Sequence, residues 1–202
     1  MTKGKLIVFE GGEGSGKSSH VKRTAQHLRR RGFEVVMTHE PGGTKLGKNL
    51  RKALLQHIDQ PVNRAELLLF LADRAQHVAE IIQPAMKRGA IVLCDRFTGS
   101  TLAYQIGARH LQPARFIKTM ERYARFNLQP NATIYLDVDP KIGLKRKTSF
   151  TRFEYESLKF HQAVRVYFQK LSQQSNWHRL NANRPLTAVQ VDIDTLIDRI
   201  CR

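Results

Sequence analysis

The chain has 202 residues, of which 41% are hydrophobic and 25% are charged, which is typical of one globular domain with a hydrophobic core. No apolar run approaches the roughly 18 residues of a membrane helix, and no apolar signal segment opens the sequence. Lys and Arg number 34 against 17 Asp and Glu, a net charge of +17. That excess favours anionic partners, but the basic residues are scattered, so nucleic acid is not expected as the main partner. The two cysteines suggest no disulfide framework, so we expect a cytoplasmic protein.

Short apolar runs bounded by turn signals predict four strands, with helical spacing between them. Val21, Ala25 and Leu28 share one face of a predicted helix, which should end where Gly32 can adopt a left-handed conformation. Strands that alternate with helices predict a parallel sheet covered on both faces. The four runs are LIVF at 6–9, EVVM at 34–37, AIVLCD at 90–95 and ATIYLDV at 132–138.

Two further segments complete the predicted organisation. The run at 63–89 indicates a buried helix that ends or bends near Pro84. The stretch GLKRKTSFTRFE at 143–154 is basic and poor in aliphatic residues, and it is either a mobile segment or an ordinary turn. No repeat or linker interrupts the chain, so residues 1–202 are expected to form one domain.

The stretch FEGGEGSGKSS at 9–19 contains the pattern G-x-x-x-x-G-K-[ST] between a predicted strand and a predicted helix. Glycines in such a loop let backbone N–H groups surround a phosphate, and the following helix N-terminus adds positive charge. Lys17 would bridge the outer phosphates of a nucleoside triphosphate, and the Ser18 hydroxyl would bind Mg²⁺. The alternative is a glycine-rich turn that matches by chance. The expected ATP-binding residues here are Gly11, Gly12, Glu13, Gly14, Ser15, Gly16, Lys17, Ser18 and Ser19.

Three other groups suit a second, nucleotide-like ligand. Asp95 and Arg96 follow the third strand, where they would hold Mg²⁺ and a second phosphate, or form a capping Asp and a surface Arg. Phe70 and Arg74 lie four residues apart on one helix face and suit stacking on a base, although the spacing by itself more often indicates a core Phe and a solvated Arg. The last group, Ser100 with Tyr104 and Thr101 with Gln105, has polar side chains suited to a base edge and sugar.

The ordered set FEGGEGSGKS, EPGGT, LFLADR, DRF, STLAYQ, YLDVDPKIGLKR and RFE closely resembles the thymidylate kinase family over nearly the whole chain. The resemblance implies a three-layer α/β/α P-loop fold with a five-stranded parallel sheet. It also implies Mg²⁺-dependent phosphoryl transfer from ATP to dTMP and a homodimer. A kinase for another nucleoside monophosphate or for a deoxynucleoside is the alternative enzyme. A nucleic-acid-binding P-loop ATPase is supported by charge alone.

The resemblance also implies roles by position. It places Glu13 on the deoxyribose 3′-hydroxyl, Phe70 on the thymine face and Arg74 on its O4. The remaining acceptor residues are Arg51 and Arg96 at the phosphate, Ser100 and Gln105 around the base and Tyr104 beside the sugar.

The resemblance further implies that a lid at about 146–154 supplies the basic residues of catalysis. The phosphate loop GEGSGK lacks the arginine found in one subgroup of the family and resembles the other subgroup, in which the lid carries them. Arg152 is the leading candidate, with Arg146 and Lys147 behind it. A lid cation of this kind would stabilise charge on the transferring phosphoryl group. The expected catalytic set is therefore Lys17, Asp95, Arg96 and Arg152.

Overall fold

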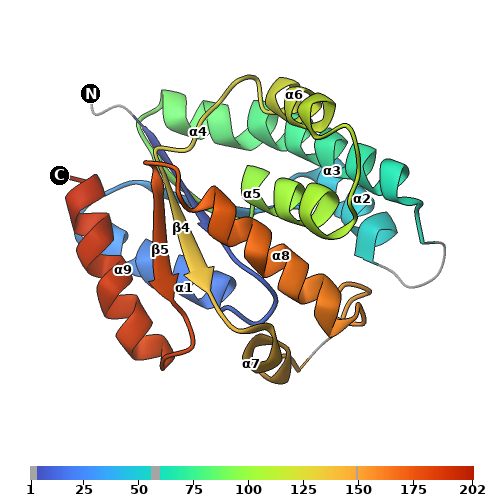
Figure 1. Ribbon diagram of the computed structural model, residues 1–202. Coiled ribbons are helices and arrows are strands. Elements are labelled where there is room, and N and C mark those ends of the chain that lie inside the picture. Colours follow the sequence, from blue (N-terminus) through green and yellow to red (C-terminus); the bar gives the residue numbers. More distant parts are fainter. Residues whose placement is uncertain (1–3, 56–59, 149) are drawn as a thin grey trace.

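The computed structural model describes residues 4–55, 60–148 and 150–202, and the expected strands form one parallel sheet (Figure 1). All neighbouring strands pair in parallel, in the order β2-β3-β1-β4-β5. The four predicted strands are thus confirmed, and a fifth strand closes one edge. The strands are β1 (Lys5–Glu10), β2 (Val35–His39), β3 (Ile91–Asp95), β4 (Ala132–Asp137) and β5 (Trp177–Asn181).

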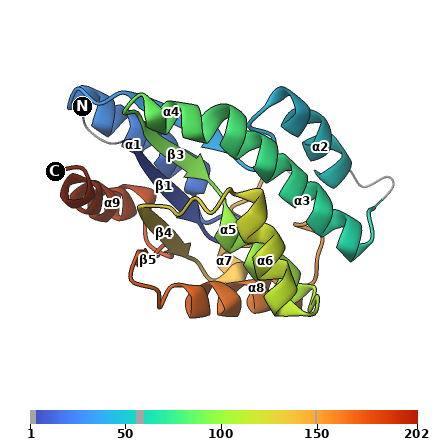
Figure 2. The same ribbon diagram turned by 90° about the horizontal axis from the view of Figure 1, so that it is seen from above.

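Helices cover both faces of the sheet, so the three-layer α/β/α prediction is confirmed (Figures 1 and 2). Successive strand residues point to opposite faces, and β1 shows this clearly. Its Ile7 and Phe9 join the core under α1 (Lys17–Arg30) and α9 (Leu186–Ile200), whereas Leu6 and Val8 pack on the other side. The remaining α-helices are α2 (Lys45–Leu55), α3 (Asn63–His77), α4 (Gln83–Lys87), α5 (Thr98–Thr101), α6 (Ala114–Ala124), α7 (Pro140–Lys145) and α8 (Leu158–Leu171).

Two π-helical segments interrupt the helices, η1 (Val78–Ile82) and η2 (Leu102–Ala108). The first joins α3 to α4, and Pro84 lies in the first turn of α4. Ile82 and Gln83 keep helical dihedral angles, so the helix is continuous here, and the π-helical turn before Pro84 accommodates the hydrogen bond that proline cannot donate. The predicted helix at 63–89 is therefore present, with its irregular turn just before Pro84. Gly32 follows α1 with a φ of 83°, as its predicted role requires.

The carboxyl ends of β1, β2 and β3 bring the sequence motifs together. Phe9 of β1 and His39 of β2 both lie in register with Asp95 at the end of β3. In a parallel sheet these ends open onto one crevice. The phosphate loop also lies against α7, because a Cβ on Gly14 would stand 1.8 Å from the Gly143 carbonyl oxygen. Only glycine permits so close a backbone approach.

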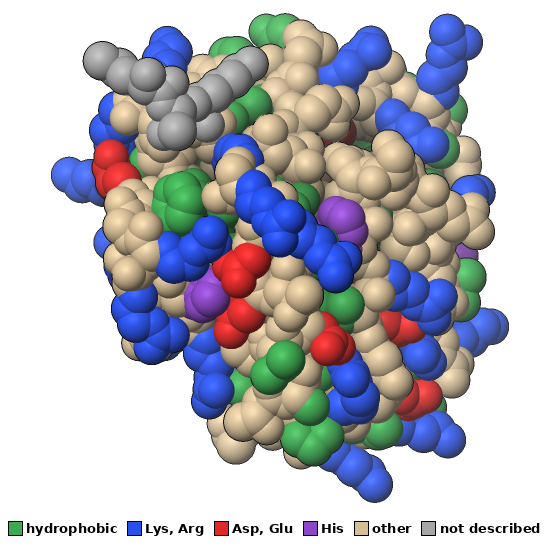
Figure 3. All heavy atoms as spheres, turned by 90° about the vertical axis from the view of Figure 1, so that its left-hand side faces the viewer, with side chains coloured by type: hydrophobic (Ala, Val, Ile, Leu, Met, Phe, Trp, Pro, Cys, Tyr) green, Lys and Arg blue, Asp and Glu red, His purple; other side chains and the backbone are tan. Residues whose placement is uncertain are grey.

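On the face that Figure 3 shows, the basic charge is spread out rather than concentrated in one block. Figure 3 shows lysine and arginine side chains scattered across one face among a few carboxylates. In the part of the chain that the structure describes, no helix is both long and apolar enough to cross a membrane.

Candidate active site

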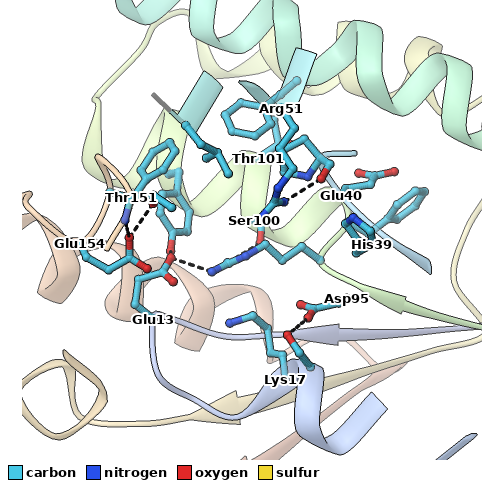
Figure 4. Close-up of a pocket in the computed structure, with 18 of the residues that line it drawn as sticks. Glu13, Lys17, His39, Glu40, Arg51, Asp95, Ser100, Thr101, Thr151 and Glu154 are labelled. Carbon is cyan, nitrogen blue, oxygen red and sulfur yellow. Dashed lines mark hydrogen bonds and ion pairs between the residues drawn. The ribbon is translucent and has the colours of Figure 1, made fainter. Parts of the chain in front are cut away.

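A cavity of about 370 Å³ opens at the carboxyl ends of the strands, between the phosphate loop, α3, the α5–η2 segment, Lys147 and residues 151–154 (Figure 4). Most of the predicted site residues line it. They are Glu13, Gly14, Gly16, Lys17, Ser18, Ser19, Arg51, Phe70, Arg74, Asp95, Arg96, Ser100, Tyr104, Gln105 and Lys147.

The Lys17 ammonium group is held inside the phosphate loop. Its Nζ donates to the carbonyl oxygens of Gly11 at 3.0 Å and Gly12 at 2.8 Å, and to Ser15 Oγ at 3.2 Å. Burial and the nearby Arg96 guanidinium lower the pKa of Lys17 to about 8. The loop therefore holds a fixed cation that can bind an anionic phosphate.

Ser18 and Asp95 meet beside that loop, as their proposed metal role requires. Ser18 Oγ donates a hydrogen bond to Asp95 Oδ2 at 2.5 Å, which joins the start of α1 to the end of β3. A hydroxyl and a carboxylate are hard oxygen donors of the kind that Mg²⁺ prefers, alongside water and phosphate oxygens. The pair therefore fits the ion chemically.

Arg96 turns back toward the phosphate loop because its backbone is left-handed, with a φ of 71°. This conformation is uncommon for a residue other than glycine and often marks functional sites. Its Nη1 donates to the Gly11 carbonyl and to Ser100 Oγ, both at 3.1 Å, and Nη2 donates to Glu13 Oε1 at 2.7 Å. The guanidinium thus stands between the loop and the α5–η2 segment.

Glu13 points into the cavity and not at the phosphate cradle (Figure 4). Its Oε1 accepts hydrogen bonds from Arg96 and from the Tyr104 hydroxyl, each at 2.7 Å. Burial alone would raise the pKa of Glu13, but Arg96, Lys17 and the Tyr104 hydroxyl lower it to about 2. The carboxylate is therefore charged at neutral pH.

Arg74 is only 2% exposed and belongs to a buried network. Its Nε and Nη2 donate to Glu40 Oε2 at 2.9 and 2.6 Å, and its Nη1 donates to Thr101 Oγ1 at 2.8 Å. His77 Nδ1 lies 2.9 Å from the other Glu40 oxygen. Phe70, one helical turn before Arg74, is half-buried and faces the cavity. The arginine is thus held rigidly at the cavity wall beside an accessible aromatic ring.

Gln105 and Arg51 also line this cavity. Gln105 Nε2 donates to Glu66 Oε1 at 2.5 Å, while its Oε1 is buried without a hydrogen-bond partner among the described residues. Arg51 Nη1 donates to the Pro41 carbonyl at 2.8 Å. Burial and the nearby Arg96 lower the pKa of Arg51. A buried amide oxygen without a partner suits a ligand donor such as a ring N–H.

The structure separates the three lid candidates. Arg152 is 5% exposed, is ion-paired with Glu66, donates to the Leu54 carbonyl and does not line the cavity. Arg146 donates to the Ala182 carbonyl at 2.8 Å, also outside the cavity. Lys147 lines the cavity and pairs with Glu154 at 2.9 Å. In this conformation Lys147, and not the leading candidate Arg152, presents its charge to the site. Ser149 of the expected lid lies outside the described residues.

Sequence reasoning missed several residues that shape the site. The most important is Glu40, which holds Arg74, although its EPGGT motif was recognised. Burial alone would raise the pKa of Glu40, but Arg74 and His77 lower it, so Glu40 remains an anion. Glu10 at the end of β1 also escaped notice, and it accepts from the Ser100 hydroxyl at 2.6 Å. The sequence did contain a signal for Glu10, because a carboxylate at the end of an apolar strand is unusual enough to indicate a site residue. Other missed lining residues are His39, Leu55, Phe97, Thr151, Phe153 and Glu154.

Comparison with known proteins agrees with this geometry. A family model described as thymidylate kinase matches residues 9–193. The chain belongs to the thymidylate kinase family. A thymidylate kinase of Pseudomonas fluorescens (strain Pf0-1) is 45% identical over 98% of this chain and 96% of the relative. Another, from Protochlamydia amoebophila (strain UWE25), is 46% identical over 93% of this chain and 89% of the relative.

Proposed function

We propose that this protein transfers the γ-phosphoryl group of ATP to dTMP, giving dTDP and ADP. The observation that carries this proposal is a second cation suited to a phosphate, Arg96, which donates to the same Gly11 carbonyl as Lys17, so that the two cations lie side by side in one cavity. The name of the relatives supports it, because a thymidylate kinase phosphorylates thymidylate. An acceptor that already carries a phosphate needs no side chain as nucleophile, so positioning and charge neutralisation suffice.

The donor side would use the phosphate loop. Backbone N–H groups at 11–19 would bind the donor phosphates, and Lys17 would bridge the outer two. Ser18 and Asp95 would hold Mg²⁺, which neutralises phosphate charge when bound. Lys147 would add a cation from the lid, with Arg146 nearer the loop after β5. Arg152 would join them only after leaving Glu66.

The acceptor side would use the opposite wall. Arg96 and Arg51 would bind the dTMP phosphate, and Phe70 would stack on thymine. Arg74, held by Glu40, would donate to the base, and Glu13 would accept from the 3′-hydroxyl of the sugar. Ser100, Tyr104 and Gln105 would complete the contacts to the base and sugar.

We also infer that residues 1–202 form one domain and that the protein acts as a cytoplasmic homodimer. Exposed apolar side chains on two neighbouring helices support the dimer, since Leu68 of α3 and Phe116 and Tyr123 of α6 are 56%, 58% and 85% exposed. These two helices pack against each other. Sedimentation equilibrium of wild type and Tyr123→Glu tests this, and a monomeric wild type contradicts it.

A coupled assay of ADP formation tests the activity, with ATP and a panel of monophosphates and nucleosides. We expect dTMP to be the best acceptor and thymidine to be inactive. Comparable turnover of thymidine, a preference for another monophosphate, or DNA-stimulated hydrolysis without any acceptor would overturn the proposal.

A further inference from the structure

A second cavity, of about 820 Å³, shares Phe97 and no other described residue with the lining of the active-site cavity. One side is α6, and the other is formed by the starts of β4 and β5 and the end of α8. Its floor contains Glu10 and Phe97, and Trp177 contributes to its wall. Nothing in the proposed kinase mechanism uses this space.

Three cations of α6 face this cavity without acidic partners among the described residues. Arg115, Lys118 and Arg122 follow one another at steps of three and four residues, which places them on one side of the helix. All three are exposed. Like charges this close repel one another, and a bound anion would relieve that repulsion.

The carboxylates in the same walls do not neutralise these cations. Glu10 accepts from the backbone N–H groups of Phe97 and Ser100 and from the Ser100 hydroxyl. Glu121 accepts from Thr98 Oγ1 at 2.6 Å and pairs with Arg125 at 3.0 Å. Both are at most 2% exposed, so neither carboxylate reaches the exposed row of cations.

We propose that this cavity binds a linear polyphosphate, either free or carried by a nucleotide. From Arg115 to Arg122 the helix rises about 10 Å, which suits a chain of phosphates better than a single one. The three side chains would contact successive phosphates. Lys118 would act as a point charge, and Arg115 and Arg122 would act as forked hydrogen-bond donors. A hollow with walls of low dielectric strengthens that attraction relative to a flat basic surface.

The occupied cavity would also influence the acceptor site, because two wall residues contact both. Glu10 bonds Ser100, which lines the active-site cavity. Glu121 lies 3.6 Å from Arg74 Nη1 and also pairs with Arg125. An anion that draws Arg125 away from Glu121 strengthens the hold of Glu121 on Arg74. We therefore expect a changed KM for dTMP when the cavity is filled.

Trp177 supplies a direct readout, since it is the single tryptophan of the chain and lines this cavity. Tripolyphosphate is titrated at constant ionic strength and Trp177 fluorescence is recorded. A Lys17→Met background removes triphosphate binding at the phosphate loop. In that background we compare Lys118→Gln/Arg122→Gln with Lys87→Gln/Arg199→Gln, which removes two exposed cations outside both cavities.

We expect a saturable signal whose dissociation constant rises at least tenfold in the cavity variant and less than twofold in the control. Equal weakening in both variants, or no saturable signal, overturns the site. A parallel titration with dTTP distinguishes the source: tighter binding than tripolyphosphate that the cavity variant weakens at least tenfold indicates a nucleotide, and equal or weaker binding indicates the phosphate chain alone. Binding of a thymidine oligonucleotide without either small anion also overturns the proposal. Thermal unfolding checks that each variant is folded.

Discussion

The Glu13 carboxylate and the Arg96 guanidinium form an ion pair at 2.7 Å across the mouth of the phosphate loop. Each group therefore has a partner before any substrate arrives. An acceptor phosphate must compete with Glu13 for Arg96, while a sugar hydroxyl can take the place of Arg96 at Glu13. Substrate binding would thus exchange one ion pair for two ligand contacts.

Glu13→Gln should weaken binding of dTMP while ATP binding remains. The charge-assisted hydrogen bond to the 3′-hydroxyl is worth about 1.5–3 kcal/mol when intact. A cycle that crosses Glu or Gln with dTMP or its 3′-deoxy analogue measures the coupling. Tyr104→Phe is the matched control, because it removes a donor to Glu13 but leaves the carboxylate. Additive effects of the two changes would show that Glu13 does not contact the sugar.

Arg96→Ala should weaken dTMP binding by about 2–5 kcal/mol if the arginine pairs with a desolvated phosphate. Steady-state kinetics over a range of dTMP concentrations measures the change in kcat/KM. Arg96→Lys should recover part of the loss, because it keeps the charge but not the forked donors. Unchanged KM and kcat in Arg96→Ala would place the acceptor phosphate elsewhere.

Phe70→Ala should remove about 1–3 kcal/mol of acceptor binding through lost stacking on the base. The ring is half-buried, and its centroid lies 6.3 Å from that of Phe153. Calorimetric titration with dTMP and, separately, with ATP measures the effect, and ATP affinity should hardly change. Global unfolding of the variant would show instead that the ring serves the core.

Lys147→Met should lower kcat, whereas Arg152→Met should mainly lower the unfolding temperature. Lys147 lines the cavity, but Arg152 is buried with Glu66, and removing one member of a buried pair costs about 3–5 kcal/mol. Kinetics and thermal unfolding on both variants separate the two effects. A folded Arg152→Met enzyme with a greatly reduced kcat would instead make Arg152 the catalytic lid residue.

The pH profile should show a descending limb near pH 8 in kcat/KM for ATP. Burial and Arg96 lower the pKa of Lys17 to about 8, so above that pH the free enzyme loses the ammonium charge that attracts phosphate. Bound ATP stabilises the charged form and raises this pKa, so kcat should decline only at higher pH. A flat kcat/KM up to pH 9.5 would contradict the assignment.

The strands β1 to β4, the helix α1 with its stop at Gly32, the long helix at 63–89 and the phosphate loop were predictable from the sequence pattern, whereas the fifth strand followed only from the family resemblance. These features depend on contacts between residues close in the chain, such as the common face of Val21, Ala25 and Leu28. The closeness of Ser18 and Asp95 was also predictable, because the carboxyl ends of parallel strands share one crevice.

Only the tertiary structure decided which charged groups pair with which. Arg152 lies within the predicted lid, yet Glu66 of a distant helix draws it into the interior. Arg74 was predictable as a site residue, but its rigid orientation comes from Glu40, which lies in the turn after β2. Such pairs form because a buried charge needs a partner, and the partner is whichever opposite charge the packed fold brings within reach. Spacing along the chain carries no record of that proximity.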